Sequence, residues 1–368
     1  MIYYLTAVVF FLMSVKYPRL NDTTAILSLK QHHNKSVLFF LGISIFWLVL
    51  HDGLRWEIGT DWDSYYNFFI NNEAAAHYEI GYTIVTRVFR AFTDSYTLYL
   101  LAQALFTYII LYHFIKSYSV YPEMSLCIFY CTMIGLMGSN RQLIAIAICL
   151  MSVKYVIYRS LPKFLICLLV ACCFHTTSMV FVLTYFLYNI KLKYYYVWGI
   201  IALCIIINLA GLINNIPFIE YAVFLDSNSA EKLSFYANND SLSGFSIFGT
   251  LKRCLIISAA LYCKPKSAKV YNLFLNMYIV GTVIYTLFIG SILGIMAGRG
   301  AVYFNISEII LLPYIFYFIY IKMGHRISKT IWLIFFIFLI YMMYRDMLSY
   351  VIAYDLNIYT PYKSVLFI

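Results

Sequence analysis

Four charged side chains lie within nine positions of the stretch LRWEIGTDWDSYYNFF, residues 54–69: Arg55, Glu57, Asp61 and Asp63. Only 11% of the chain is charged, so such a cluster is unusual and indicates a chemical function. A carboxylate can take a proton from a hydroxyl as a general base. A guanidinium can hold phosphate or carboxylate through two parallel hydrogen bonds. The stretch therefore predicts proton transfer beside an anionic group, with its acids and its arginine converging on one site.

Asp61 is the first candidate for the base, because it follows a Gly-Thr pair at a turn that leads into a short helix. The alternative is that Asp61 or Thr60 only caps that helix. Asp63 or Glu57 could serve as the base instead. Glu79 is a further catalytic candidate, either as a base or as the residue that orients an arginine.

His175 is the other candidate base, in the sequence FHTTS at the middle of the apolar run 162–188. That run is too long for one untilted helix across a hydrocarbon core of about 30 Å. We expect a re-entrant or hairpin pair of short helices there, with His175 at the tip. The alternative is a hydrogen-bonded histidine with a structural role.

The elements that must position these groups are membrane helices. The chain of 368 residues is 63% hydrophobic, and its apolar runs of roughly 15 to 25 residues fit helices that cross a bilayer. We expect an all-α integral membrane protein, a polytopic bundle of about 11 to 12 transmembrane segments forming one domain over 1–368. The runs fall at 2–15, 36–51, 97–115, 123–138, 141–158, 162–188, 194–212, 247–262, 270–296, 301–321 and 330–345.

Basic residues orient such a bundle, since they are retained on the cytoplasmic side. With residues 16–35 placed inside, 16 of the 26 lysines and arginines lie in or beside cytoplasmic loops. This arrangement predicts an outer loop at 52–96, a large outer loop at 213–246 and an outer C-terminal tail at 346–368. It requires that the amphipathic segment 79–92 lies in the membrane interface as a helix that does not span.

Lysine and arginine are sorted between the two faces. Of the 16 cytoplasmic basic residues 13 are lysines, whereas seven of the other ten are arginines. Orientation alone gives no reason for this sorting, so we expect an outer cavity lined by arginines that binds phosphate or pyrophosphate. Each arginine can alternatively be an interfacial anchor or the partner of a nearby acid. The seven are Arg55, Arg87, Arg90, Arg141, Arg253, Arg299 and Arg345.

Arg141 and Arg299 carry the strongest individual arguments. Arg141 lies in the first turn of a span, where Ser139 or Asn140 is expected to cap the helix and where a cation is unfavourable unless an anion binds. Arg299 lies between two glycines, which leave the backbone open to a close approach. The alternative for Arg299 is an exposed arginine in a flexible turn.

Taken in order, these residues resemble the EpsG/Wzy family of bacterial polysaccharide polymerases over most of the chain, from about residue 40 to the end. No single motif is specific, and the order within a multi-span bundle carries the resemblance. The motifs are Arg55, Gly59-Thr60-Asp61-Trp62 with Tyr65, Glu79-Ile80-Gly81-Tyr82, Arg141-Gln142, Phe174-His175-Thr176-Thr177-Ser178, Arg299-Gly300 with Tyr303-Phe304, and Tyr359-Thr360-Pro361-Tyr362.

The resemblance implies a GT-C-like glycosyltransferase in the bacterial inner membrane, with its active site on the periplasmic face. Such enzymes move a growing glycan from undecaprenyl pyrophosphate to the non-reducing end of a new lipid-linked repeat unit. The implied partners are that lipid-linked oligosaccharide, membrane lipid and a chain-length regulator, without a metal, a cofactor or nucleic acid. The implied substrate-binding residues are Arg55, Tyr65, Arg141, Gln142, Arg253, Arg299 and Tyr303.

Two other activities fit the same membrane build. One is an O-antigen ligase or another lipid-phosphate-sugar transferase, which differs in its acceptor. The other is a flippase for the same lipid-linked units. A transporter places its key charges near the middle of the bilayer, whereas the charges here gather at the outer ends of spans, which favours an enzyme. The polar loop 213–246 can cover a saccharide groove or act as a lid or linker, and Tyr359 and Tyr362 are interpreted as interfacial anchors.

Overall fold

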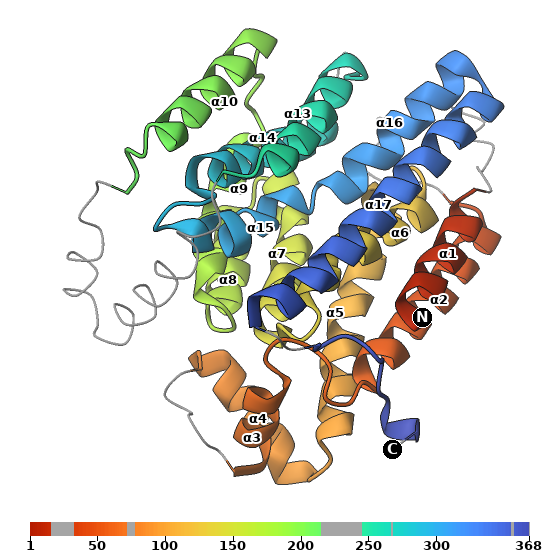
Figure 1. Cartoon of the computed structure of the whole chain (residues 1–368), viewed down its shortest axis with the longest axis vertical. Helices are drawn as coiled ribbons and strands as arrows, with labels where there is room; N and C mark the ends of the chain where they lie inside the picture. The colour runs from red at the N-terminus through yellow and green to blue at the C-terminus, as the bar shows by residue number, and fades with distance from the viewer. Residues whose placement is uncertain (16–32, 72–77, 215–244, 266–267, 355–356, 368) are drawn as a thin grey trace. The chain divides into compact units, whose positions relative to one another are not determined.

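The computed structural model describes residues 1–15, 33–71, 78–214, 245–265, 268–354 and 357–367. Throughout these ranges every regular element is a helix, as Figure 1 shows. All eleven apolar runs of the sequence coincide with helices, which confirms the all-α prediction. The loop expected at 213–246 is described only at its two ends, residues 213–214 and 245–246. All of its acidic residues lie outside the described ranges.

The chain forms two compact units, Met1–Met179 with Leu312–Ile368, and Val180–Leu311. The expectation of one polytopic domain stays a prediction. The first unit holds α1 (Ile2–Ser14), α2 (Lys35–Gly53), α3 (Trp62–Asn71), α4 (Ile80–Phe92), α5 (Tyr96–Tyr118), α6 (Pro122–Met133), η3 (Ile134–Leu136), α7 (Asn140–Ile157), α8 (Leu161–Cys172), α17 (His325–Tyr354) and η7 (Val365–Phe367). The second holds most of η4 (Thr176–Leu183), α9 (Thr184–Leu187), α10 (Tyr194–Leu209), α13 (Ile247–Tyr262), α14 (Lys269–Phe288), η6 (Met296–Gly300), α15 (Val302–Asn305) and the start of α16 (Glu308–Met323).

Within the described part of the chain, five helices are long and apolar enough to cross a membrane: α2, α5, α7, α14 and α17. The number is six if η6 and α15 count with α16 as one bent span. The other predicted spans correspond to shorter helices, among them α1, α6, α8 and α10. The run 162–188 is divided as expected, because α8 ends at Cys172 and η4 begins at Thr176, with His175 at the break.

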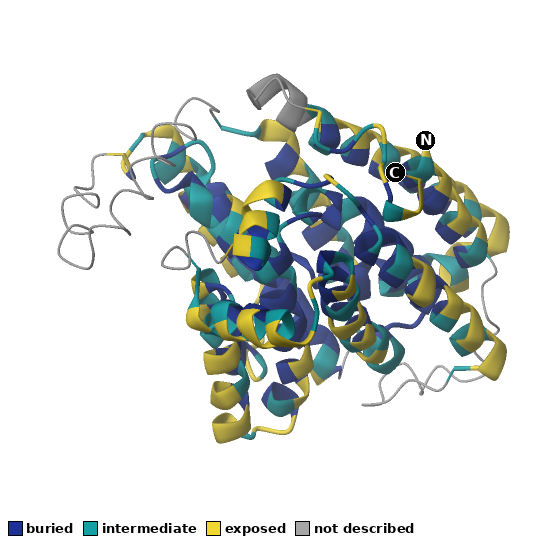
Figure 2. Cartoon of the chain, turned by 90° about the horizontal axis from the view of Figure 1, so that it is seen from below, coloured by how far each residue is buried: buried dark blue, intermediate teal, exposed yellow. Residues whose placement is uncertain are grey.

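Helices of the first unit pack through apolar faces pinned by a few polar contacts. α2 packs on α5, α5 on α7, and α7 on α8, while α17 lies against α1 and α6. The indole N–H of Trp47 donates to Thr6 Oγ1 at 3.1 Å, and that of Trp332 donates to Ser14 Oγ at 2.8 Å. Several of these helices, α1, α2 and α17 among them, combine buried residues with exposed apolar ones, and Figure 2 shows buried and exposed residues along the ribbons. Exposed apolar faces are expected where lipid is the solvent.

In the second unit, α10 and α13 both pack on α14. Asn208 donates to the carbonyls of Leu287 and Ile289, both at 2.9 Å, which satisfies backbone acceptors at the end of α14. In the same way Asn276 donates to the carbonyls of Leu187 and Ile190. Such bonds matter in an apolar environment, where an unpaired backbone group is costly.

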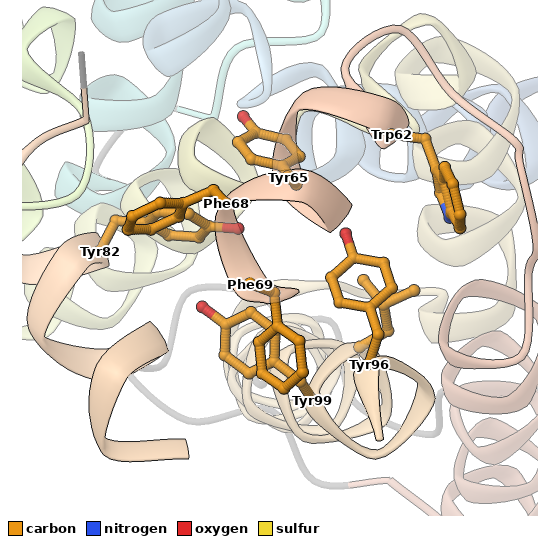
Figure 3. Packing of buried hydrophobic residues seen from close by; sticks show 8 residues of the cluster. Trp62, Tyr65, Phe68, Phe69, Tyr82, Tyr96 and Tyr99 are labelled. Carbon is orange, nitrogen blue, oxygen red and sulfur yellow. The ribbon is translucent and has the colours of Figure 1, made fainter. Parts of the chain in front are cut away.

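The short helices α3 and α4 lie at one end of α5 and share an aromatic cluster with it (Figures 1 and 3). Figure 3 shows Trp62, Tyr65, Phe68 and Phe69 of α3 facing Tyr82 of α4 and Tyr96 and Tyr99 of α5. The helix predicted at 79–92 is present as α4, but its apolar stripe divides. Val85 and Phe89 pack on the cluster, while the remaining apolar residues are exposed: Ile80, Ile84, Val88 and Phe92. Its place in the membrane interface stays a prediction.

Candidate functional site

Glycines bring four distant segments of the first unit into close contact. The backbones of Gly59 and Gly138 touch, so that a Cβ on Gly59 would lie 2.6 Å from Gly138 Cα. Both have positive φ, 110° and 98°, which favours glycine. The N–H of Gly81 donates to the carbonyl of Cys173 at 2.8 Å, and a Cβ there would lie 2.7 Å from the same oxygen. These contacts assemble the starts of α3, α4 and α7 around the break after α8.

Arg141 lies at the centre of this assembly, in the first turn of α7. Its Nη1 makes an ion pair with Glu79 Oε2, and its Nε donates to the Tyr65 hydroxyl at 3.1 Å. The guanidinium carbon also lies 4.9 Å from the ring centroid of Tyr78. The Arg141 side chain keeps 18% of its surface exposed, so one edge of a well-anchored cation remains accessible. A positive group at a helix N-terminus is an anion-binding arrangement.

Glu79 also contacts the turn that carries His175. The second oxygen of Glu79, Oε1, accepts from the N–H of Thr176 at 3.3 Å. His175 directly precedes that residue and is 7% exposed, with its Nδ1 2.6 Å from Thr177 Oγ1. The Glu79 carboxylate therefore joins the Arg141 guanidinium to the backbone of the turn that carries His175.

Asp61 immediately precedes α3, and its carbonyl accepts from the N–H of Tyr65 at 3.1 Å. Burial raises the pKa of the Tyr65 hydroxyl to about 12; the Arg141 charge opposes this rise and the Asp61 carboxylate adds to it. Asp61 also contributes to the raised pKa of Tyr78, after burial and against Arg141. Asp61 thus belongs to the same electrostatic environment as Arg141, which permits a role in proton transfer as well as one at the helix start.

Arg55 lies in a separate buried network. It donates to the carbonyl of Asp52 at 2.6 Å and to Asn140 Oδ1 at 2.5 Å, and only 3% of the residue is exposed. Tyr108 donates to Asp52 Oδ2 at 2.7 Å. These residues and Gln103 line a small pocket between α2, α5 and α7. Arg55 is therefore bound to protein groups that hold the N-terminus of α7, and its terminal nitrogens already have partners.

The sequence profile of the EpsG family matches residues 38–364, nearly the whole chain. The chain belongs to the EpsG family. EpsG is a polysaccharide polymerase family, so its members act in polysaccharide biosynthesis. Neither the search of curated proteins nor that of solved structures gave a match.

In this EpsG-family protein the four charges of residues 54–69 do not converge on one site. Arg55 is buried, Asp61 lies near Arg141, and Asp63 is exposed. Glu57 points to the surface, where its carboxylate pairs with Lys363 Nζ at 2.5 Å and both side chains are about half exposed. The prediction that all four converge was wrong, because Arg55 is buried against Asp52 and Asn140 while Glu57 pairs with Lys363 at the surface.

The closing motif has a different role from the interfacial anchoring expected of its tyrosines. Tyr359 is 1% exposed, and Tyr362 stacks on His51 and donates to its carbonyl at 2.5 Å. The same segment accepts from the N–H groups of Trp56 and Gly59, at 3.0 and 3.1 Å. Both tyrosines are thus packed within the protein, where they fix the stretch before α3.

The remaining predicted binding residues belong to both units. Gln142 is buried inside α7. In the second unit Arg253 stacks on Tyr285, with its guanidinium carbon 3.4 Å from the ring centroid, and donates to the carbonyl of Gly249. Arg299 lies in the π-helical turn η6, and Tyr303 is buried in α15. A shared cavity of Arg55, Arg141 and Arg299 stays a prediction, and Arg55 is already engaged.

The sequence reading missed Asp52, Tyr108, Tyr78 and the role of Asn140. One signal was available, since an acid at the end of an apolar run is a candidate functional residue in a membrane protein. Ser139 or Asn140 was expected as the cap of α7; Ser139 occupies that position but makes no side-chain capping bond. Over the described ranges no group of three or more histidine, cysteine or acidic residues lies close enough to hold a metal.

Proposed function

We propose that this protein polymerises a surface polysaccharide from lipid-linked repeat units in the bacterial inner membrane, with its active site on the periplasmic face. The donor is a growing glycan on undecaprenyl pyrophosphate, and the acceptor is the non-reducing end of a new lipid-linked unit. Membership of the EpsG family supports the polymerising activity. The observation that carries the chemistry is Arg141, a partly accessible guanidinium at a helix start, paired with a carboxylate that also holds the turn carrying His175.

The proposed reaction is a single transfer. An acceptor hydroxyl oxygen attacks the anomeric carbon of the donor glycan, and the bond from that carbon to the pyrophosphate oxygen breaks. The leaving pyrophosphate keeps the bonding electrons, and Arg141 stabilises its added negative charge. The hydroxyl proton passes to Asp61, with His175 as the second candidate base. Glu79 is less suited to this role because Arg141 already pairs with it.

The surface glycan of a deletion strain tests this proposal. A polymerase deletion leaves one repeat unit attached where many are found in the wild type, whereas loss of a ligase or a flippase leaves none. Complementation with Arg141→Lys keeps the positive charge but removes the planar guanidinium that can make two parallel hydrogen bonds. It should shorten the glycan chains. Arg345→Lys is the matched control, because Arg345 is exposed and pairs with its neighbour Asp346.

The base is tested by a second matched pair. Asp61→Asn removes a base but keeps a helix-capping oxygen, and it should abolish elongation. Asp63→Asn, two positions away on the exposed side of α3, should leave the chain length unchanged. Full elongation by Asp61→Asn would exclude Asp61 as the base, and His175→Gln would then be decisive. The variants Arg253→Lys and Arg299→Lys test whether the donor also binds to those arginines, in which case each variant should make shorter glycan chains.

A further inference from the structure

Glu79 contacts both parts of the proposed site through separate oxygens. Oε2 pairs with Arg141, the proposed pyrophosphate ligand, and Oε1 accepts from the backbone N–H of Thr176. Thr176 follows His175 and begins η4. One carboxylate therefore connects the anion-binding residue to the turn that carries a candidate base.

Two bonds hold that turn to the start of α4, and they differ in kind. The bond from the Gly81 N–H to the Cys173 carbonyl joins two backbones at 2.8 Å and involves no charge. The bond from Thr176 to Glu79 depends on a side chain whose other oxygen is held by Arg141. The first bond persists whatever binds at Arg141, whereas the second can be released.

A pyrophosphate at Arg141 must compete with Glu79 for the same guanidinium. Both ligands are anions, and two anions brought together at one cation repel each other. The pyrophosphate carries more charge and also interacts with the N-terminus of α7, which favours it over the carboxylate. The Glu79 side chain is 17% exposed, so it has room to turn towards solvent.

We infer that Glu79 is a displaceable counter-ion that couples pyrophosphate binding at Arg141 to release of the turn carrying His175. This inference rests on the proposed function for the identity of the anion. Glu79 then acts as a positioning residue: it occupies the arginine before the donor arrives, and its displacement frees the Thr176 amide and lets His175 move. The base is thus made available only when the donor is bound.

Inorganic pyrophosphate and the purified full-length protein test the competition directly, by calorimetry. Glu79→Gln keeps the shape and an oxygen for Thr176 but removes the competing charge, so pyrophosphate should bind roughly ten-fold more tightly than to the wild type, which is about 1.4 kcal/mol. The matched control is Glu57→Gln, which removes an exposed carboxylate of the same unit and should leave the affinity unchanged. Equal or weaker binding by Glu79→Gln, or no binding by either protein, overturns the inference.

Amide hydrogen exchange of the segment 173–178 tests the coupling. If Glu79 had only a structural role, pyrophosphate would not change the exchange rate of this segment. Pyrophosphate should accelerate exchange at Thr176 in the wild type and in Glu57→Gln. In Glu79→Ala the same amide should exchange rapidly with or without pyrophosphate, because its acceptor is gone. Exchange that stays unchanged when pyrophosphate binds to the wild type overturns the coupling.

The inference and the proposed function fail in different ways. If Glu79→Gln shows no change in pyrophosphate affinity while Arg141→Lys still shortens the surface glycan, the coupling is wrong and the donor site stands. If Arg141→Lys leaves both pyrophosphate affinity and chain length unaltered, the donor site itself is wrong.

Discussion

Replacing Arg55 with lysine keeps the buried charge but removes the planar guanidinium. The two terminal nitrogens of that group donate to the Asp52 carbonyl and to Asn140 Oδ1, at 2.6 and 2.5 Å. A lysine can satisfy one of these acceptors in this geometry and leaves the other unpaired in an apolar region. Losing a hydrogen bond to a charged donor costs about 1.5 to 3 kcal/mol. We therefore expect Arg55→Lys to lower the free energy of unfolding by about this amount.

The assay is denaturant unfolding of the purified protein in detergent micelles, combined with a double-mutant cycle. Asn140→Ala removes the acceptor alone, and its effect combined with Arg55→Lys should be smaller than the sum of the two by about 0.5 to 3 kcal/mol. The control Arg345→Lys should change stability by less than about 0.5 kcal/mol, because its ion pair is exposed.

One outcome would refute the reasoning. If Arg55→Lys unfolds like the wild type but binds pyrophosphate more weakly, Arg55 is a ligand, as the sequence alone suggests. If Arg55 instead anchors α7, the variant loses stability. The surface glycan that it makes is then shorter, because Arg141 is displaced along with Asn140.

Three further predictions concern the neighbouring structure. Gly59→Ala should destabilise the protein by about 1 to 3 kcal/mol, because its Cβ would meet Gly138 and its φ is positive; Gly42→Ala, with open space around it, should be neutral or stabilising. The raised pKa of Tyr65 means that its contribution to stability is full below pH 10 and is lost as the pH rises through about 12. The unfolding temperature of the wild type should therefore fall relative to that of Tyr65→Phe over this pH range, and a constant difference would contradict the burial of this hydroxyl. Deleting residues 357–368 removes the partners of the stretch before α3 and should lower the unfolding temperature, whereas deleting 366–368 should not.

Much of the fold can be predicted from the sequence, because the lipid bilayer restricts apolar segments to helices. Runs of apolar residues become helices in lipid, since no other local structure satisfies the backbone there. The break at His175 was also predictable, because the run 162–188 exceeds the length of one span. The separation of the chain into two compact units has no comparable signal in composition or in charge.

The candidate site was predicted in its residue types more than in its geometry. Asp61, Glu79, Arg141 and His175 lie at the starts or breaks of helices, and those positions can be inferred from turn residues and from the lengths of the runs. Arg55 could not be placed in this way, because its partners, such as Asn140, are about 85 residues away in sequence. Long-range pairing of this kind leaves no periodic trace, so an arginine in a network and an arginine that binds a ligand are identical in sequence.

The pairing of residues 54–59 with 358–365 constrains the order in which the molecule matures. The segment that fixes the entrance to α3 is synthesised after α17, about 300 residues later than the stretch with which it pairs. An unfinished chain therefore inserts most of its helices while the approach to Asp61 is still unsupported. Activity should appear only once residues 358–365 have been made, and a ribosome stalled before residue 358 would leave an inserted but inactive polypeptide.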